Sequence, residues 1–395
     1  MEQQPLTSPL SELIQERKVL VCVGAGGVGK TTMSAAIGVA AARSGRRTLV
    51  LTVDPARRLA NALGLGALDE EVQTIEVAHF APDGPASAVP LDVAMLDVKS
   101  TFDRVVHRYA TSEAHYQAIT GNAFYHQAST ALAGSQEYMA MERLYEIATS
   151  ASYDLIVLDT PPSAHALDFL DAPKRLIALL ESPGFRLLLR SFRRSHSEGG
   201  GLFSRGSLIM RGIDRFTGAD MFHGLLDFFA TLSATFDGFV ERARNVLTLM
   251  HSERTAFMIV SACDETSIHE GLFLHKRLRD EKMPVGAWIL NRVRPYSTLP
   301  LAAGDQLGAL LAEALSKASA GQHSADVVQN TARQLAISSA ELARLALEDQ
   351  RLEQRLKRAL EVDLAVIAVP RSADEPATLA ELSFLCEALL RQSGT

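Results

Sequence analysis

The sequence predicts a doubly wound α/β fold, built on a mainly parallel sheet of about seven strands. Short runs rich in Val, Ile and Leu alternate along the chain with segments of helical spacing. Most of the runs are continuously apolar, which is typical of strands buried on both faces. Because strands separated by helices form right-handed crossovers, the sheet should be parallel and covered on both sides. The expected strands are Val19–Val23, Thr48–Val53, Leu91–Val98, Leu155–Leu158, Ala256–Val260, Trp288–Leu290 and Leu364–Val369.

Three intervals between these strands are too long for simple crossovers and predict helical insertions. They span residues 100–150, 176–250 and 300–360. We expect these insertions to form a helical subdomain along one edge of the sheet. No convincing internal repeat occurs, so residues 1–395 are interpreted as a single domain.

The composition excludes several classes of protein. Of the 395 residues, 47% are hydrophobic and 22% charged, as in globular proteins. The net charge of −7 leaves no basic excess for a nucleic acid, which we exclude as a partner. No window approaches the ~18 apolar residues of a membrane span, and residues 1–18 lack the apolar core of a signal peptide. A cytoplasmic protein is therefore expected. Three widely spaced cysteines, expected to be buried, support neither a zinc site nor a disulfide framework: Cys22, Cys263 and Cys386.

A glycine-rich segment, G-A-G-G-V-G-K-T-T, lies between the first expected strand and a helical stretch. This order of strand, loop and helix is the context that supports a Walker A phosphate loop. Glycines let backbone amides face phosphate oxygens, and the helix N-terminus adds partial positive charge. An accidental glycine loop is the alternative, but lysines are rare in this chain. The segment predicts binding of ATP and Mg²⁺, with Lys30 on the β- and γ-phosphates and Thr31 on the metal. The candidate nucleotide ligands are Gly24, Gly26, Gly27, Val28, Gly29, Lys30, Thr31 and Thr32.

A carboxylate follows the second expected strand, in the segment T-V-D-P-A-R-R-L. Asp54 comes at the carboxyl end of this strand, where ligands bind in such sheets. The side chain could position or deprotonate the attacking water, and it also joins the candidate Mg²⁺ ligands. The alternative is an N-cap, because Asp before Pro is a favourable helix start.

The fourth expected strand ends in a second carboxylate, in the segment D-L-I-V-L-D-T-P-P. An apolar strand that ends in Asp is a Walker B pattern, in which Asp159 would hold Mg²⁺ directly or through water. The residues that follow predict a switch able to sense the γ-phosphate, with Pro162 and His165 as its candidates. A structural histidine is the alternative for His165.

Together these motifs resemble the arsenical-pump and guided-entry (tail-anchored protein targeting) ATPase family, in the deviant Walker A branch of P-loop ATPases. The resemblance rests on Gly24–Thr32, on D-P-A-x-x-L at Asp54–Leu59 and on D-T-x-P-x-x-H at Asp159–His165. It implies an ATP-driven dimer that opens and closes, with Asp54 as the catalytic carboxylate. It also implies that helical subdomains contact the client.

The chain departs from the family pattern in its phosphate loop. The family carries a second lysine just after the first loop glycine, reaching the partner's phosphates, and this position is Ala25 here. Three outcomes stay open: slow hydrolysis, substitution by an arginine such as Arg58, or a lysine supplied by a different subunit. The chain could accordingly form a homodimer, or a heterodimer with a related ATPase. The family position that contacts adenine is Asn291, whose amide offers a donor and an acceptor. A turn asparagine is the alternative.

Three functions are compatible with these features. The first is an ATPase whose opening and closing controls binding of a hydrophobic or membrane-protein client, suggested by the apolar content of Leu176–Met250. The second is an energising or regulatory ATPase subunit of an anion transport system of the arsenite type. The third is a partitioning-type positioning ATPase, which the acidic-to-neutral segment Ala377–Thr395 disfavours.

Overall fold

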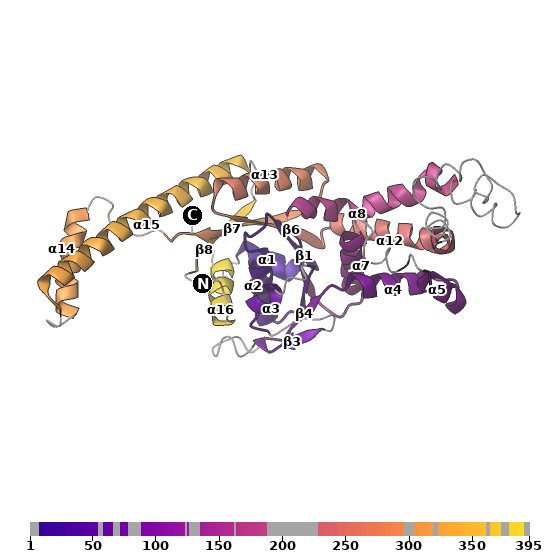
Figure 1. Ribbon diagram of the computed structural model, residues 1–395, viewed down its shortest axis with the longest axis horizontal. Coiled ribbons are helices and arrows are strands. Elements are labelled where there is room, and N and C mark those ends of the chain that lie inside the picture. Colours follow the sequence, from indigo (N-terminus) through magenta and orange to yellow (C-terminus); the bar gives the residue numbers. More distant parts are fainter. Residues whose placement is uncertain are drawn as a thin grey trace, which may run out of the picture.

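A computed structural model describes residues 8–53, 58–65, 72–77, 88–122, 125, 135–161, 163–187, 228–295, 304–318, 323–360, 364–372 and 379–390. Its centre is one eight-stranded sheet in the order β3-β4-β2-β5-β1-β6-β7-β8 (Figure 1). All neighbouring strands are parallel except the pair β3 and β4. The strands are β1 (Val19–Gly24), β2 (Thr48–Thr52), β3 (Gln73–Ile75), β4 (Leu91–Met95), β5 (Leu155–Asp159), β6 (Thr255–Ala262), β7 (Val285–Val293) and β8 (Ala365–Pro370).

The predicted doubly wound α/β fold is confirmed, and all seven expected strands are present. The eighth strand, β3, was missed because its three residues are largely polar and form no apolar run. The expected strand Leu91–Val98 was too long. It ends at Met95 because Asp97 caps the next helix, accepting hydrogen bonds from the backbone N–H groups of Lys99 and Ser100 at 2.9 Å.

Helices cover both faces of the sheet. The first face buries apolar side chains of α1 (Pro9–Glu16), α2 (Lys30–Arg43), α3 (Arg58–Ala62) and α16 (Leu379–Leu390). The second face packs against α7 (Ser135–Thr149), α8 (Ser163–Glu181), α12 (Phe236–His251), α13 (Glu265–Asp280) and the last turns of α15 (Ala325–Ala359). Strands with helices on both sides bury both of their faces, which is why their sequences are continuously apolar.

A cluster of helices extends from one end of the sheet (Figure 1). It joins α4 (Val98–Tyr109) and α5 (Glu113–Thr120) to α7, α8 and α12. The core of this cluster is aromatic: the Phe102 ring packs at a tilt against the rings of Tyr125 and Phe239, with centroid distances of 5.6 and 6.3 Å. It therefore has a hydrophobic core separate from the two that cover the sheet.

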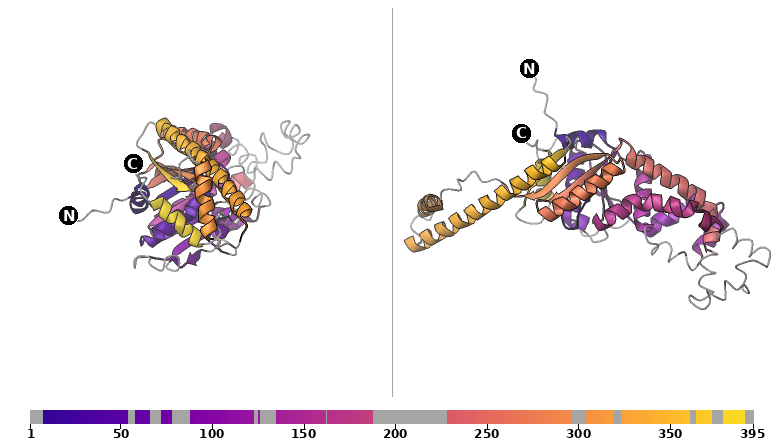
Figure 2. Two further views of the ribbon diagram at one scale, coloured as in Figure 1. Left: turned by 90° about the vertical axis from the view of Figure 1, so that its left-hand side faces the viewer. Right: turned by 90° about the horizontal axis from the view of Figure 1, so that it is seen from above.

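Two helices of the third insertion form an arm at the opposite end of the molecule (Figure 1). α14 (Gly304–Ala318) packs along the first half of α15, and the pair projects away from the sheet (Figures 1 and 2). The expectation that all three insertions lie along one edge is wrong, because the arm lies at the opposite end of the molecule from the helical cluster (Figure 1). The arm carries several exposed large apolar residues: Leu310, Val327, Leu335, Ile337 and Leu342.

None of the described helices is both long enough and apolar enough to cross a membrane.

Candidate nucleotide-binding site

The glycine-rich loop joins the carboxyl end of β1 to α2, as the sequence predicts. Gly27 and Gly29 have φ values of 75° and 96°, the left-handed region that favours glycine. A Cβ on Gly24 would lie 2.1 Å from the Val260 carbonyl oxygen of β6, so no side chain fits there. A Cβ on Gly27 would meet no atom within 4 Å. Gly24, Gly27 and Gly29 are thus all favoured by the backbone of the loop, and Gly27 also borders open space.

Lys30 opens α2 and folds back over the loop. Its Nζ atom donates to the carbonyl oxygens of Gly24 at 3.0 Å and Ala25 at 2.7 Å. The residue is only 7% exposed, although lysine is rarely buried. The N-cap of α2, Gly29, makes no side-chain capping hydrogen bond. Because Lys30 is the first residue of α2, its ammonium group and the helix N-terminus both place positive charge at the loop. Together they favour binding of an anion there.

Asp159 ends β5 between β1 and β2, opposite Cys22 on one side and Thr52 on the other. It is fully buried, and the Thr52 hydroxyl donates to its Oδ2 atom at 3.0 Å. The next hydroxyl, Thr160 Oγ1, donates to the Cys22 carbonyl oxygen at 2.7 Å and ties the end of β5 to the strand that leads into the loop. Asp159 is the residue that the sequence predicts here, whereas the roles of Thr52 and Thr160 depend on partners that lie on other strands.

Asn291, near the end of β7, reaches the loop from the other side of β1. Its Nδ2 atom donates to the Val28 carbonyl oxygen at 2.8 Å, and its Oδ1 atom accepts from the Arg292 backbone N–H at 2.8 Å. A Cβ on Gly29 would lie 2.4 Å from Nδ2. Direct adenine contact remains a prediction, since an amide retains one further N–H and one lone pair. The observed bonds show that Asn291 fixes the shape of the loop.

The other predicted residues are placed less fully. Thr31 and Thr32 lie half-buried in the first turn of α2, and Arg58 is the exposed first residue of α3. Asp54, Pro162 and the side chain of His165 lie outside the described part of the chain.

Ala25 is buried, with 6% of its surface exposed, and it belongs to the core under the sheet. A longer side chain at this position must first displace its neighbours or turn out of that core.

These residues fit Mg²⁺ and a nucleotide. Among the described residues, no three His, Cys, Asp or Glu side chains gather into a complete metal cluster. Mg²⁺ does not need one, because it is usually held by one or two protein oxygens together with substrate phosphates. Thr31 and Asp159 are the described residues that would hold the metal, and Lys30 and the loop amides would hold the phosphates.

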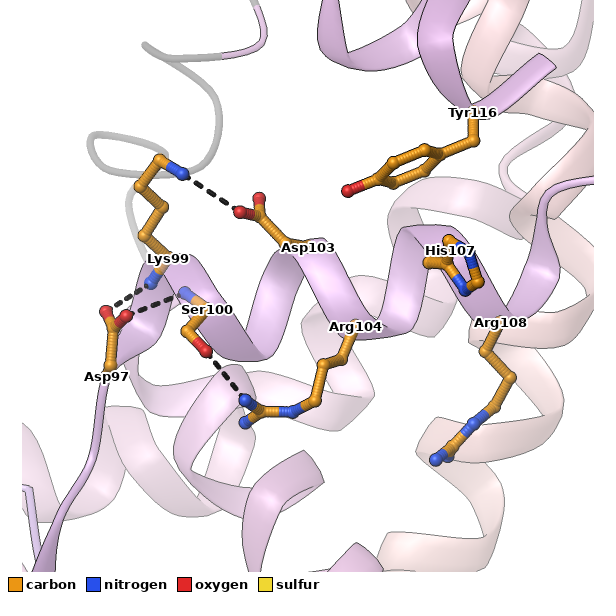
Figure 3. A pocket seen from close by; sticks show the side chains of 8 residues that line it. All are labelled: Asp97, Lys99, Ser100, Asp103, Arg104, His107, Arg108 and Tyr116. Atoms are coloured by element: carbon orange, nitrogen blue, oxygen red, sulfur yellow. Dashed lines mark hydrogen bonds and ion pairs between the residues drawn. The ribbon is translucent and has the colours of Figure 1, made fainter. Parts of the chain in front are cut away.

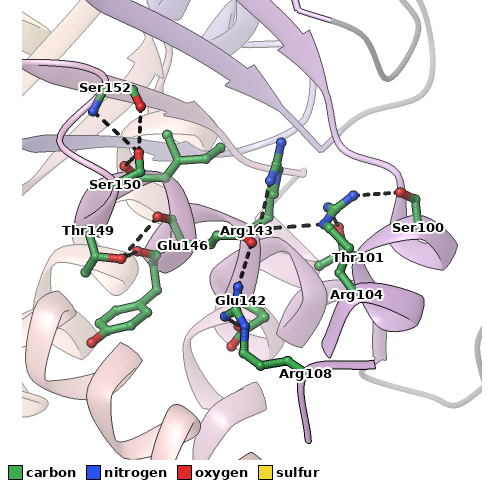
Figure 4. A network of polar contacts seen from close by, with 12 residues as sticks. Ser100, Thr101, Arg104, Arg108, Glu142, Arg143, Glu146, Thr149, Ser150 and Ser152 are labelled. Atoms are coloured by element: carbon green, nitrogen blue, oxygen red, sulfur yellow. Dashed lines mark hydrogen bonds and ion pairs between the residues drawn. The ribbon is translucent and has the colours of Figure 1, made fainter. Parts of the chain in front are cut away.

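A separate pocket of about 610 Å³ lies on the helical cluster and not at the loop (Figure 3). Its charged groups largely satisfy one another: Lys99 donates to Asp103 at 2.9 Å, and Arg104 to the Ser100 hydroxyl at 2.6 Å. Arg108 contacts Glu146 at 2.9 Å in the adjoining polar network (Figure 4). With both charge signs already paired, the pocket offers no anion site comparable to the loop.

A mainly parallel, doubly wound sheet with a glycine-rich loop and a lysine at the start of the helix that follows the loop defines a P-loop nucleotide-binding protein. Residues 17–300 match the family model described as anion-transporting ATPase. The match covers most of the chain, so the protein belongs to that family, and the resemblance found in the sequence is confirmed. The match ends before α14 and α15.

Individual relatives agree with this assignment. A candidate arsenical pump-driving ATPase from Prosthecochloris vibrioformis is 31% identical over 159 residues, 40% of this chain and 36% of the relative. ATPase GET3 from Malassezia globosa is 26% identical over 281 residues, 70% of this chain and 72% of the relative. ATPase ASNA1 homolog 1 from Paramecium tetraurelia is 25% identical over 175 residues, 43% and 49% of the two chains. The chain thus spans only about a third of the length of the bacterial relative.

Proposed function

We propose that this protein is a Mg²⁺-dependent ATPase in which nucleotide opens and closes a dimer and so controls a bound partner. The observation that carries the proposal is the loop itself: a buried lysine at a helix N-terminus, beside open space at Gly27 and a buried carboxylate at Asp159. The family assignment and the relatives named ATPase support the same activity.

In this proposal each residue has a defined task. The loop amides and Lys30 bind and orient the β- and γ-phosphates, which places the leaving oxygen next to positive charge. Bound Mg²⁺ supplies charge neutralisation at these oxygens, held through Thr31 and Asp159. Thr52 keeps the Asp159 carboxylate oriented through its 3.0 Å hydrogen bond. Asp54 is the proposed base that positions the attacking water, and Arg58, Pro162 and His165 are the proposed switch residues.

The proposed partner is a hydrophobic segment of another protein, with the protein acting in the cytoplasm. Two apolar residues of the segment 176–187 are exposed, Leu179 at 49% and Leu187 at 66%. They support this proposal because a client-binding surface would present apolar side chains to solvent. Copurification tests the proposal: varied hydrophobic helices would support it, whereas one defined membrane protein would favour an anion-pump subunit.

The cysteines weigh against direct arsenite sensing. All three are buried, and burial raises the pKa of Cys22, Cys263 and Cys386 to about 12. Only a thiolate is a good ligand for a soft metal. The three cysteines also lie on different elements: in β1, just after β6 and in α16. An energising subunit remains the second candidate because a relative is named for an arsenical pump, but we propose no arsenite site on this chain.

Two measurements test the core proposal. Phosphate release from ATP should require Mg²⁺ and stop when EDTA removes it. The solution mass should double on adding a non-hydrolysable ATP analogue if nucleotide closes a homodimer. A mass that stays monomeric with the analogue, in a protein that binds it, would favour a heterodimer with a lysine-bearing subunit. A protein that binds no ATP would overturn the proposal.

A further inference from the structure

The end of β7 has an unusual backbone next to the nucleotide loop. Arg292 has φ 63°, a left-handed conformation that is uncommon for residues other than glycine. The pairing of β7 with β8 shifts register between Leu290 and Val293. Such strained positions persist only where the surroundings hold them. Asn291, which bonds to the loop at Val28, lies directly before this kink.

Two bonds from α15 hold the chain just beyond the kink. The Asp349 carboxylate accepts the Arg294 backbone N–H at Oδ2, 2.7 Å away, and pairs with the Arg294 guanidinium at Oδ1, also 2.7 Å. Asp349 is 1% exposed, and a buried carboxylate needs such partners to offset its lost hydration. One side chain thus fixes both the backbone and the side chain of Arg294.

Asp349 also contacts the chain just after β6, the strand on the other side of β7 from β8. Cys263, just after β6, lies with its Sγ atom 3.8 Å from the Asp349 carbonyl oxygen, and its backbone N–H donates to the Asn291 carbonyl oxygen at 3.0 Å. Asn291 is therefore held by β6 on one side and by the clamped chain on the other. Its amide has little freedom to leave the loop.

We propose that Asp349 is a positioning residue of the nucleotide site: by clamping Arg294 it holds the kink that aims Asn291 at the Val28 carbonyl. The inference rests on the proposed ATPase function for its effect on nucleotide, and on geometry alone for its effect on the loop. It extends the site to a helix beyond residue 300, where the family match ends. Because α15 is one helix, a displacement of the arm reaches the phosphate loop through Asp349, Arg294 and Asn291.

The test compares Asp349→Asn with a matched variant elsewhere. Glu142 is equally buried and accepts a hydrogen bond from Arg242 Nε at 2.6 Å in the helical cluster. Glu142→Gln therefore removes a buried charge of the same kind without touching the loop. Arg294→Lys is a milder variant, because it keeps the backbone donor to Asp349.

We expect two results. Affinity for a fluorescent, non-hydrolysable ATP analogue falls about three- to thirtyfold in Asp349→Asn and less in Arg294→Lys. In the protein without nucleotide, amide hydrogen exchange across residues 24–32 becomes faster in Asp349→Asn. Glu142→Gln lowers the melting temperature but changes neither quantity.

The two readouts separate the inference from the proposed function. Unchanged exchange in the loop of Asp349→Asn would overturn the inference, whether or not ATP binds. An Asp349→Asn protein that only melts earlier, with analogue affinity within about 1.5-fold of the unmodified chain, would overturn it as well. Failure of the unmodified protein to bind the analogue would instead overturn the ATPase proposal.

Discussion

Polar side chains make different contacts at the two ends of the parallel strands. We call the end where these strands begin the amino edge and the end where they finish the carboxyl edge. At the amino edge, Lys18 donates to the Tyr153 carbonyl, Arg46 donates to the Asp154 carbonyl at 2.5 Å, and Arg47 binds the Asp154 carboxylate at 2.8 Å. At the carboxyl edge, Lys30 and Asn291 also donate to carbonyl oxygens, but those oxygens belong to the phosphate loop.

Burial separates the two edges. Asp154 and Arg47 expose 39% and 58% of their side chains, whereas Lys30, Asp159 and Asn291 are buried. Exposed ion pairs are screened by water and contribute little to stability, while buried polar groups depend on each partner. Single substitutions at the amino edge should therefore change stability little. Single substitutions at the carboxyl edge should disrupt the geometry of the binding site. Four predictions test this contrast, in order of decreasing effect.

The largest expected effect is loss of ATP binding in Lys30→Ala, because the lysine supplies the only described side-chain cation that contacts the loop carbonyls. Affinity should fall by at least about 100-fold, in line with the loss of a charge-assisted phosphate contact. Calorimetry measures the affinity of the variant for ATP. Lys18→Ala, at the other end of β1, is the matched control and should bind ATP normally. Unchanged affinity in Lys30→Ala would remove the basis for the phosphate-loop assignment.

Asp54→Asn should bind ATP with near-normal affinity yet turn over about 10²–10⁴-fold more slowly. The substitution keeps the shape and a capping oxygen but removes the charge that orients or deprotonates water. Single-turnover phosphate release separates this effect from binding. Equal turnover in the variant would leave Asp54 as a helix cap and nothing more.

Ala25→Lys tests the missing family lysine. Because Ala25 is buried in the core, we expect a loss of about 1–3 kcal/mol in unfolding free energy. Faster hydrolysis in spite of this loss would show that a closed dimer carries the side chain to the partner's phosphates. A destabilised variant with no gain in rate would favour a separate lysine-bearing subunit. Chemical denaturation and ATPase rates are both required, with Arg58→Ala as the control for a substitute cation.

The smallest effect is expected at the amino edge. Hydrogen bonds from Arg47 lower the pKa of Asp154 from 3.8 to about 2. A carboxyl group with a lowered folded-state pKa stabilises the fold above about pH 4, and this contribution disappears as the pH falls from about 4 to 2. Asp154→Asn should therefore flatten the pH dependence of the melting temperature in this window, by only about 1–2 °C because the pair is exposed. A steeper acid transition in the variant would contradict the assignment.

Several features could be predicted from the sequence alone, because each is specified by a short segment of the chain. Seven strands were visible as apolar runs, since strands buried on both faces are mostly apolar on both. The phosphate loop was visible because only glycine tolerates the φ values of Gly27 and Gly29 and the contact of Gly24 with β6. The family could be named from three short motifs for the same reason.

Other features depended on the order of strands in the sheet, which no single segment encodes. Asn291 meets Val28 only because β7 lies beyond β6, which lies beside β1. The arm and the helical cluster project from opposite ends of the molecule (Figure 1), which no single segment of the sequence indicates. From the sequence, Asp349 looks like an ordinary charged residue on the surface of a helix. The packing of α15 instead buries it against Arg294. The sequence by itself determined the fold and the phosphate loop, whereas only the tertiary structure decided which distant side chains hold that loop in place.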